Sequence, residues 1–525
     1  MIDALATIPG RIRVAALAAP DTAVIVHSVT RPDETTLGQL YDESLSVAAG
    51  LRQIGIRAGD VVAVQLPNWR ECFVTHAAVW LAGAVLLPIV PIYGPREVGF
   101  ILAQSGARAF VAADSVRGRE NAALVDGLAH LPALAHRIVV GKSGSAALPF
   151  QELARCDNGA FEAFGPADEA ERCLLVYTSG TTSTPKGVVH THATLLAEID
   201  VTSQLRGDHG QGARLNAFPS GHIAGVLGIL RMLTAPNLTV TMDAWNPTTA
   251  ARLISDHAVT ASGGAPIHLA GLLDAAERDG FDLSGLREYT TGAASVTAAL
   301  IRRADGFGVR AFRSYGSTEH PTISSGTPDD PLDKRADTDG RLTPFTRIRV
   351  VDGGGADVKP GIPGEILTVG PELFVGYYDA ALTDTSMAGG WFRTGDIGYV
   401  DSDGYLCITD RKKDIIVRGG ENISSKEVED VLMEHPAVSE AAAVGVPDER
   451  FGERVCAFVV LRRGWTIDLR QVQDHFDTAG LARQKTPEQL RLVAELPRTA
   501  SGKVQKHVLR QQLSGLNAAR RPQVP

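Results

Sequence analysis

Apolar and polar positions along roughly the first 320 residues follow two periods, a helical one and a strand-like one, in turn. One face of a predicted helix collects four side chains, which are Tyr41, Leu45, Ala48 and Leu51. The apolar run 61–66 then predicts a short buried strand. A second unit follows, with a helix over 77–84 and a strand over 85–89. This alternation predicts an α/β fold with mainly parallel sheets.

The pattern changes in two places farther along the chain. A polar, breaker-rich segment at 328–341 leads into the short predicted strands IRVVD and EILTV, which indicates a small β-rich module. Near Asp410 the charged run RKKD opens a mixed stretch that is typical of a compact α+β domain. We therefore predict an N-terminal domain over 1–410 and a C-terminal domain over 411–525.

The composition is that of an ordinary soluble protein and narrows the class of partner. The chain has 525 residues, of which 44% are hydrophobic and 21% charged, and this length predicts several domains. The net charge of −9 and the lack of a basic stripe argue against a nucleic-acid partner. The oligomeric state stays open, a homodimer included.

Cysteine usage and apolar stretches bear on the compartment. The five cysteines form no CxxC pair, which favours free thiols in a reducing cytoplasm. The N-terminus lacks the charged and apolar regions of a signal peptide. The longest apolar stretch, 77–92, contains glycine and proline and is too short to span a bilayer. We expect a cytoplasmic enzyme without an integral membrane segment.

The stretch LLVYTSGTTSTPKGVVHTH, at 174–192, carries the strongest chemical signal. An apolar run predicts a strand that ends in a loop of small and hydroxyl residues, namely Thr178, Ser179, Gly180, Thr181, Thr182, Ser183 and Thr184. Small residues let backbone N–H groups approach a polyanion, and Lys186 adds a mobile positive charge. This chemistry suits the β- and γ-phosphates of ATP. The loop is not a Walker A motif, because Lys186 is followed by Gly187 and the GxxxxGK[ST] spacing is absent.

Three weaker motifs follow. In YGSTE, the ring of Tyr315 can stack on a purine, while Thr318 and Glu319 suit an α-phosphate and its Mg²⁺. In WFRTGD, Asp396 suits two ribose hydroxyls. In PRTASGK, Lys503 lies on a glycine-containing loop near the C-terminus. Taken singly, each also fits a turn, a helix cap or a solvated tail.

Taken together and in this order, the motifs resemble the adenylate-forming superfamily, which holds acyl-CoA synthetases, luciferases and peptide-synthetase adenylation domains. The resemblance runs from about Thr36 to His507 and includes the phosphate loop, FPSGH, YGSTE, WFRTGD, DRKKD with GGENI, and PRTASGK. It implies a large N-terminal domain of two α/β lobes plus a distorted β-barrel, with a small mobile C-terminal lid.

The resemblance also implies a role for each matching residue. The ATP phosphates would be held by the loop from Thr178 to Lys186. Tyr315 would stack on adenine and Gly316 beside it would also bind the nucleotide. Thr318 would touch the α-phosphate, and Glu319 would hold Mg²⁺. The ribose would be bound by Asp396 and Arg411. The segment bordering adenine and the acyl pocket would be Gly292, Ala293, Ala294 and Ser295.

The implied C-terminal residues belong to a moving lid. Lys503 would bridge the acyl carboxylate and the α-phosphate, and Lys413 would be the hinge. Gly419 and Gly420 would face the pantetheine arm of coenzyme A. Two positions depart from the family pattern. Ser183 replaces a glycine, so a loop needing positive φ there would be strained, and we expect a conformation that tolerates serine and keeps ATP binding. Ser425 replaces a proline, which we expect to loosen its turn.

The acid itself is only partly constrained. Neither 218–228 nor 261–269 offers a carboxylate for an α-ammonium group, and the sequence ends shortly after Lys503, so an amino acid activated for a carrier domain is disfavoured. An apolar pocket with His222, Ile223 and Leu227 predicts a fatty, alicyclic or aromatic acid, as in medium-chain or cyclohexanecarboxylate-type CoA ligases. Two alternatives remain, an acyl-AMP ligase that loads a carrier protein and a non-catalytic nucleotide-binding protein.

Overall fold

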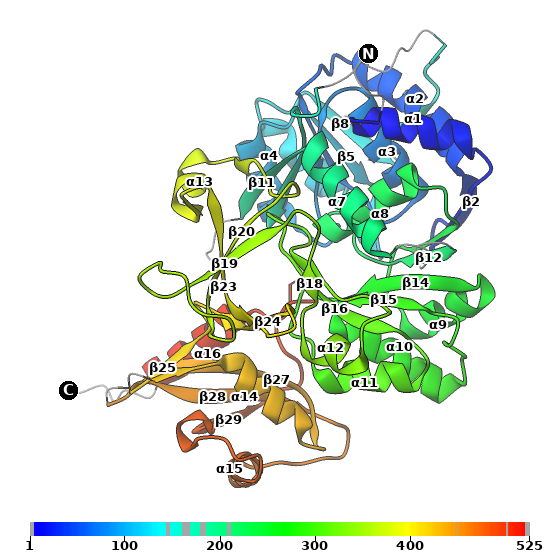
Figure 1. The fold of residues 1–525 in the computed structure, drawn as a ribbon. Helices are drawn as coiled ribbons and strands as arrows, with labels where there is room; N and C mark the ends of the chain where they lie inside the picture. Colours follow the sequence, from blue (N-terminus) through cyan, green and yellow to red (C-terminus); the bar gives the residue numbers. More distant parts are fainter. Residues whose placement is uncertain are drawn as a thin grey trace.

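The fold is mixed α/β, with a large N-terminal part and a smaller C-terminal part (Figure 1). The computed structural model describes residues 5–142, 147–159, 168–178, 185–206, 212–419, 421–448, 450–499 and 502–519. The N-terminal part contains two large sheets, a smaller antiparallel sheet and a two-stranded sheet of β6 (Ser115–Val116) and β7 (Arg119–Glu120), and the C-terminal part contains a further sheet. The predicted fold class is confirmed.

The first lobe is built on an eight-stranded sheet, parallel except at the edge formed by β21 and β11. Its strands in spatial order are β21 (Gly376–Tyr377), β11 (Lys186–Thr191), β10 (Arg172–Thr178), β4 (Val85–Pro88), β3 (Val61–Gln65), β5 (Ala109–Ala113), β8 (His136–Val140) and β9 (Leu148–Pro149). The helices of this lobe are α1 (Ile8–Ala18), α2 (Leu37–Gln53), α3 (Arg70–Leu81), α4 (Pro95–Ser105), α5 (Ala122–Gly127) and α6 (Phe150–Ala154). One core joins the sheet to α1, α2 and α3, and another joins its opposite face to α4.

The first two predicted units are confirmed in this lobe. The predicted helix face lies on α2, where Ala48 and Leu51 are fully buried and Tyr41 packs at the edge of the core. The strand predicted at 61–66 is β3. The helix predicted at 77–84 overlaps α3, but α3 begins earlier, at Arg70. It ends at Leu81 because Gly83 adopts a left-handed φ of 72° just beyond the helix cap.

The second lobe has a nine-stranded sheet, parallel over its six central strands, β1, β13, β12, β14, β15 and β16. Its strands in spatial order are β18 (Arg341–Leu342), β17 (Ser324–Ser325), β16 (Ala311–Tyr315), β15 (Glu288–Thr291), β14 (Val259–Gly264), β12 (Ala213–Asn216), β13 (Thr239–Met242), β1 (Ala23–His27) and β2 (Asp33–Thr36). Helices α9 (Pro247–Asp256), α10 (Pro266–Asp279), α11 (Ala298–Gly306) and α12 (Leu332–Asp337) lie on one side, and α7 (His192–Arg206) and α8 (Ile223–Thr234) on the other (Figure 1).

The remaining sheets belong to the β-rich module and the C-terminal part. The module contains β19 (Arg347–Val351), β20 (Gly364–Val369), β23 (Trp391–Val400), β22 (Met387–Ala388) and β24 (Leu406–Arg411), with α13 (Ala380–Ser386). The C-terminal sheet contains β26 (Glu421–Ile423), β25 (Ile416–Arg418), β28 (Gly452–Leu461), β27 (Val438–Asp448) and β29 (Gln489–Leu492), with α14 (Ser425–Glu434), α15 (Leu469–Thr478) and α16 (Lys506–Ala519). The predicted boundary at 410/411 falls at the end of β24 and stays a prediction.

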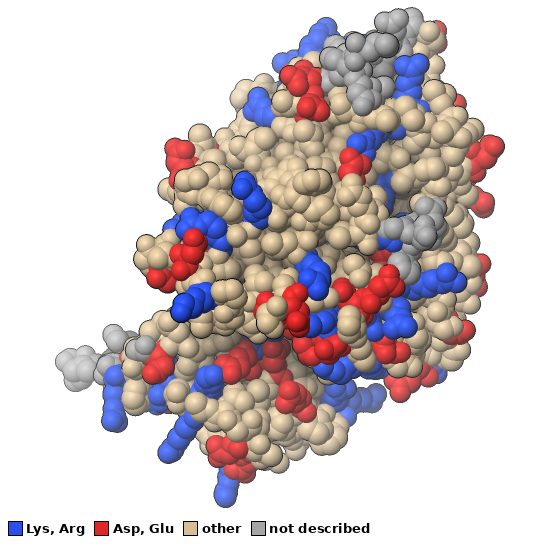
Figure 2. Space-filling view, in the orientation of Figure 1, with Lys and Arg blue, Asp and Glu red and all other residues tan. Residues whose placement is uncertain are grey.

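The surface and the thiols agree with the composition. Figure 2 shows acidic and basic side chains interspersed over the face drawn, without a continuous basic stripe. All five cysteines are free thiols, and four of them are buried. Within the described ranges, no helix has both the length and the apolar composition needed to cross a bilayer.

Candidate active site

The segment Tyr315–Glu319 starts on the last residue of β16 and turns sharply away from the sheet. Gly316 is needed in this turn, because a Cβ there would lie 1.9 Å from the carbonyl oxygen of Pro321. The carboxylate of Glu319 accepts a 2.7 Å hydrogen bond from the hydroxyl of Tyr377. Burial and the Glu319 carboxylate raise the pKa of Tyr377, so the phenol keeps the proton that it donates.

Two residues outside the predicted set connect this turn to β11. Nε2 of His190 donates to the carbonyl oxygen of Thr318 at 2.8 Å. Burial lowers the pKa of His190 to about 4, so its ring is neutral at pH 7. The Lys186 ammonium lies 5.3 Å from the centre of the Tyr377 ring, which places Tyr377 between Lys186 and Glu319. No local pattern in the sequence distinguishes Tyr377 or His190 from neighbouring core residues.

Asp396 and Arg411 face each other across β23 and β24. Oδ1 of Asp396 accepts from Nε of Arg411 at 2.7 Å, and Oδ2 accepts from the Tyr315 hydroxyl at 2.7 Å. Each carboxylate oxygen has a second lone pair, so Asp396 can also accept hydrogen bonds from ribose hydroxyls. Gly395, with a φ of 71°, forms the turn before this carboxylate. The structure thus joins the YGSTE and WFRTGD motifs directly.

The segment Gly292–Ser295 follows β15 and runs beside β16. A Cβ on Gly292 would lie 2.4 Å from the Ser314 carbonyl oxygen, so only glycine allows this close approach. Ala293 has a φ of 64°, which is uncommon for a residue with a side chain, and Ala294 follows it. Backbone strain of this kind concentrates at ligand sites. The position beside Tyr315 is compatible with the predicted contact to adenine.

Lys503 reaches the same place from the C-terminal part. Its side chain is half-buried, and a Cβ on the preceding Gly502 would lie 3.5 Å from the N-cap residue of α10. Burial and the Arg411 guanidinium lower the pKa of Lys503, while the nearby Asp396 and Glu319 carboxylates oppose that shift. Residues from three distant stretches of the chain therefore surround one space.

The predicted acyl-pocket residues lie in two environments. His222 caps α8, its Nδ1 accepting from the Ala224 N–H at 3.2 Å. Burial and the Lys503 ammonium lower the pKa of His222 to about 4, so its ring is neutral at pH 7. Ile223 and Leu227 belong to the apolar core of the first lobe. Their contact with a substrate stays a prediction.

Part of the predicted site lies outside the described residues. This applies to Ser179, Gly180, Thr181, Thr182, Ser183, Thr184 and Gly420. The two ends of the phosphate loop are described, and they are paired, since Thr178 on β10 lies opposite Lys186 on β11. On the lid, Gly419 has a φ of 61° and donates from its N–H to the Phe451 carbonyl oxygen at 2.7 Å.

The expectation that Ser425 loosens its turn is wrong. Its backbone N–H donates to Oδ2 of Asp410 at 2.5 Å, and its hydroxyl donates to Oδ1 of Asp410 at 3.1 Å. The Lys506 ammonium donates to the same hydroxyl at 2.6 Å. A proline has no N–H and would lose the first of these bonds. Between these residues, Lys413 is exposed and its carbonyl oxygen accepts from Arg510 at 3.4 Å, while its hinge role stays a prediction.

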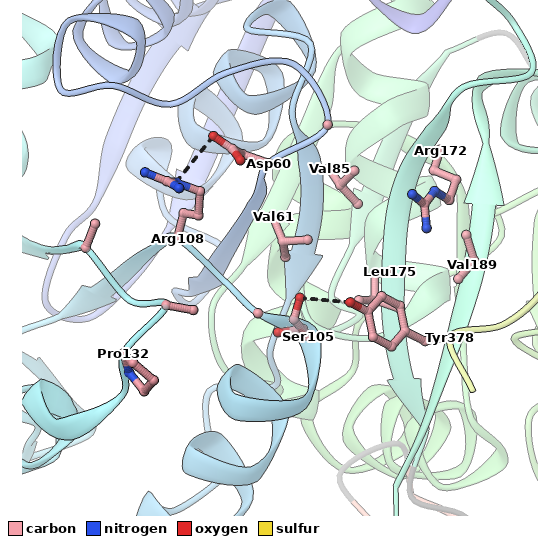
Figure 3. A pocket seen from close by; sticks show the side chains of 14 residues that line it. Asp60, Val61, Val85, Ser105, Arg108, Pro132, Arg172, Leu175, Val189 and Tyr378 are labelled. Carbon is pink, nitrogen blue, oxygen red and sulfur yellow. Dashed lines mark hydrogen bonds and ion pairs between the residues drawn. The ribbon is translucent and has the colours of Figure 1, made fainter. Parts of the chain in front are cut away.

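A cavity of about 450 Å³ lies elsewhere in the first lobe (Figure 3). Its floor is formed by apolar side chains of four neighbouring strands, Val61, Val85, Leu175 and Val189. It opens at the amino ends of β3, β4 and β10, whereas the phosphate loop follows the carboxyl end of β10. This cavity therefore takes no part in the site around Lys503.

The fold and the site together define an adenylate-forming enzyme. The chain belongs to the AMP-binding enzyme family, whose sequence model matches residues 12–378, and the AMP-binding enzyme C-terminal domain matches residues 427–503. Such enzymes include AMP-forming acid–thiol ligases, and the relatives of this chain place it among them.

Individual relatives share most of the chain. The medium-chain fatty-acid–CoA ligase of Escherichia coli K12 is 35% identical over 469 residues, covering 87% of this chain and 82% of that protein. The 3-[(3aS,4S,7aS)-7a-methyl-1,5-dioxo-octahydro-1H-inden-4-yl]propanoyl:CoA ligase of Mycobacterium tuberculosis H37Rv is 34% identical, covering 97% and 100%. The crystal structure of the anthranilate CoA ligase AuaEII in complex with anthranoyl-AMP superposes with a TM-score of 0.88 at 26% identity, covering 98% of each chain.

Proposed function

We propose that this protein is an ATP-dependent acyl-CoA ligase for a hydrophobic carboxylic acid, whether fatty, alicyclic or aromatic. It forms the acyl-AMP with release of pyrophosphate and then transfers the acyl group to coenzyme A. The observation that carries the proposal is the convergence of Lys503, Glu319 and Asp396 on one space. The relatives act on fatty, polycyclic and aromatic acids, which supports this range.

The first half-reaction needs positive charge more than it needs a base. A carboxylate that attacks the α-phosphate of ATP is already ionised, and the barrier is the approach of two anions. Lys503 would neutralise charge as it develops between them, and Lys186 would do the same at the departing pyrophosphate. His222 is neutral and borders the acyl side, so it orients the acid without adding charge.

Mg²⁺ fits the residues that are present. No group of three or more His, Cys, Asp and Glu side chains forms a metal centre in the described part of the chain. One carboxylate, Glu319, lies at the site. Its Oε1 accepts from Tyr377, no hydrogen bond joins Oε2 to the described residues, and Glu319 is the residue that would hold the cation. When bound there, Mg²⁺ supplies charge neutralisation of the phosphates.

The second half-reaction requires a thiol to reach the acyl-adenylate. Lys503 occupies the side of the site that the lid covers, so it has to leave before a thiol can enter, which gives the lid a reason to rotate near Lys413. Gly419 and Gly420 are the residues we propose to face the pantetheine arm after this rotation.

The proposal is tested with a panel of carboxylic acids. Pyrophosphate release is measured with ATP, Mg²⁺ and each acid, and thioester formation is measured with coenzyme A and, in parallel, with a pantetheinylated carrier protein. We expect pyrophosphate release with at least one hydrophobic acid and thioester with coenzyme A. If the thioester forms only with the carrier protein, the acyl acceptor is a carrier protein and not coenzyme A. If no acid gives pyrophosphate release, the ligase function is refuted.

A further inference from the structure

Helix α8 has two unlike faces. Its apolar residues pack into the core of the first lobe, including Ile223, Val226, Leu227, Leu230 and Leu233. The opposite face, with Ala224, Gly228 and Arg231 at helical spacing, is only half-buried. A Cβ on Gly228 would lie 2.5 Å from Nδ2 of Asn216 on β12, so this face of α8 lies against the nine-stranded sheet. Figure 1 shows α8 on the side of that sheet away from α9–α11.

The sheet presents a matching half-buried surface to α8. The register places Arg214 beside Ala261 and Ala261 beside Glu288. Alternate residues of a strand point to the same side of a sheet. The positions two residues farther along the same three strands therefore share this face, and they are Asn216, Gly263 and Thr290. Arg214, Asn216, Gly263 and Thr290 are all half-buried although their strands are internal to the sheet. Accessible surface therefore remains between α8 and the sheet.

This surface begins at the catalytic end of the site. The ring of Phe218 is parallel to that of His222, at 6.5 Å between centroids, and the Lys503 ammonium acts on His222. A Cβ on Gly263 would lie 3.8 Å from the Phe218 ring. With 1.5 Å per helical residue, Gly228 lies about 9 Å and Arg231 about 14 Å from His222 along α8.

The far end of the surface carries an unusual collection of hydrogen-bond donors. Arg231 donates to the hydroxyl of Ser203 at 3.1 Å and to that of Thr202, both on α7. Arg206 and Arg214 both pair with the fully buried Glu288, at 2.7 Å and 3.4 Å.

Two further donors on this surface, nearer to Phe218, are not used within the described part of the chain. Oγ1 of Thr290 is buried there without a hydrogen-bond partner. The Asn216 side chain accepts from the Phe218 N–H through Oδ1, and its Nδ2 makes no hydrogen bond to the described residues. A group of donors of this kind is complementary to an oxygen acceptor.

Charge at this end is also incompletely compensated. Three guanidinium groups, those of Arg206, Arg214 and Arg231, face Glu288 and Glu198. Burial and Glu198 raise the pKa of Glu372 to about 10, so the Glu198–Glu372 pair retains a proton at pH 7. Among the described residues of this cluster, the three guanidinium groups therefore carry three positive charges. The carboxylates carry two negative charges, one on Glu288 and one on the Glu198–Glu372 pair.

We propose that α8 and the nine-stranded sheet enclose the acyl group, and that Asn216, Arg214 and Arg231 recognise an oxygen acceptor at the end of the acid remote from its reacting carboxyl. The substrate class is thus an apolar acid that carries a distal ketone or a distal carboxylate. This inference rests on the proposed ligase function and narrows it.

The test compares three acids of equal length, decanoate, a keto-decanoate with the ketone near its far end, and decanedioate. The kcat/KM for pyrophosphate release is measured with each. We expect at least one oxygenated acid to exceed decanoate by about tenfold or more, the effect of one or two hydrogen bonds to a buried polar group. In Asn216→Leu, which keeps the size but removes the donor, the ratio of oxygenated acid to decanoate should fall toward one.

A second variant tests whether the acyl group occupies the space between α8 and the nine-stranded sheet, and it is compared with a matched control. Gly228→Ala places a methyl group 2.5 Å from Asn216 and should lower kcat/KM for the preferred acid, mainly through KM. Gly306→Ala, in α11, has no heavy atom within 4 Å of its added methyl and should leave kcat/KM unchanged. Thermal melting of each variant verifies folding.

The outcomes separate this inference from the ligase function. A wild-type enzyme that prefers decanoate, or treats all three acids alike, overturns the distal acceptor site while the ligase function stands. An oxygenated preference that persists in Asn216→Leu and Arg231→Met overturns the assignment of those residues. Lack of pyrophosphate release with these acids and with the wider panel refutes the ligase function itself.

Discussion

The proposed nucleotide end and the proposed acyl end of the site hold their charges in different ways. At the nucleotide end, Glu319 and Asp396 accept from tyrosine hydroxyls and one arginine, while Lys186 and Lys503 form no ion pair with the described residues. At the acyl end, arginines share buried carboxylates instead. The first arrangement leaves mobile cations for a polyanion that arrives and departs. The second fixes donors in place, which suits recognition more than chemistry.

The largest effect is expected for Lys503→Ala. Removing one preorganised charge at a reacting centre typically costs about 10²–10³ in rate. We expect the rate of acyl-AMP formation, measured as pyrophosphate release, to fall by about that factor. Thioester formation from supplied acyl-AMP and coenzyme A should be spared, because Lys503 leaves before the thiol enters.

The matched control for this variant is Lys359→Ala, an exposed lysine of the β-rich module, which should change neither step. If Lys503→Ala slows both half-reactions equally, Lys503 does not act in acyl-AMP formation alone, and the proposed departure of Lys503 before thioester formation is contradicted.

A smaller effect is expected at the ribose. Asp396→Asn keeps the shape and the hydrogen bond from Tyr315 but removes the charge that Arg411 and the ribose hydroxyls share. A hydrogen bond to a charged group contributes about 1.5–3 kcal/mol, so KM for ATP should rise roughly ten- to a hundredfold. The KM for the acid should change far less. A larger change in the acid's KM than in that of ATP would place Asp396 at the wrong end of the site.

The residues of the proposed nucleotide end stand in motifs that the sequence shows, whereas those of the proposed acyl end do not, for a physical reason. Phosphate, ribose and Mg²⁺ demand particular groups at particular turns, so Gly316, Glu319 and Asp396 stand in short motifs that can be recognised. The acyl end is formed by single residues on alternate strand positions and one helix face, such as Asn216, Thr290 and Gly228. Their proximity depends on sheet register, which no local pattern shows. The structure places Ile223 and Leu227 of α8 in the core of the first lobe, and their contact with a substrate stays a prediction.

The hydrogen-bond partners of the motif residues were not found from the sequence, for the same reason. Tyr377 binds Glu319 from the edge strand β21, and His190 binds the Thr318 carbonyl oxygen from β11. Both contacts connect positions far apart in the sequence. The effect of Ser425 was mispredicted because its partner Asp410 becomes its neighbour only after β25 and β26, which lie between β24 and α14, have paired.

The pH dependence of adenylation gives a finer measure of the nucleotide end. Burial and Arg411 lower the pKa of Lys503 from its usual 10.5. In the proposed reaction the ammonium form of Lys503 is the active one, so we expect activity to be present below this pKa and to be lost as pH rises through it. We expect the alkaline limb of kcat/KM to lie below pH 10.5. In Lys503→Arg the residual activity should lack this limb, because a guanidinium stays charged. A limb that persists in Lys503→Arg would assign it to another group.

The smallest effect is expected at Ser425, at the start of α14, which belongs to neither the nucleotide end nor the acyl end. Its contacts with Asp410 and Lys506 connect the C-terminal part to β24, and we expect them to affect stability alone. Ser425→Ala removes the hydroxyl that binds Asp410 and Lys506 and should lower the free energy of unfolding by about 1 kcal/mol. Ser425→Pro also removes the N–H donated to Asp410 and should lower it further, even though proline is otherwise favourable at the first position of a helix. Urea unfolding of the two variants and the wild type measures the difference. If Ser425→Pro is as stable as the wild type, the bond to Asp410 contributes nothing, and the turn is held by the helix start alone.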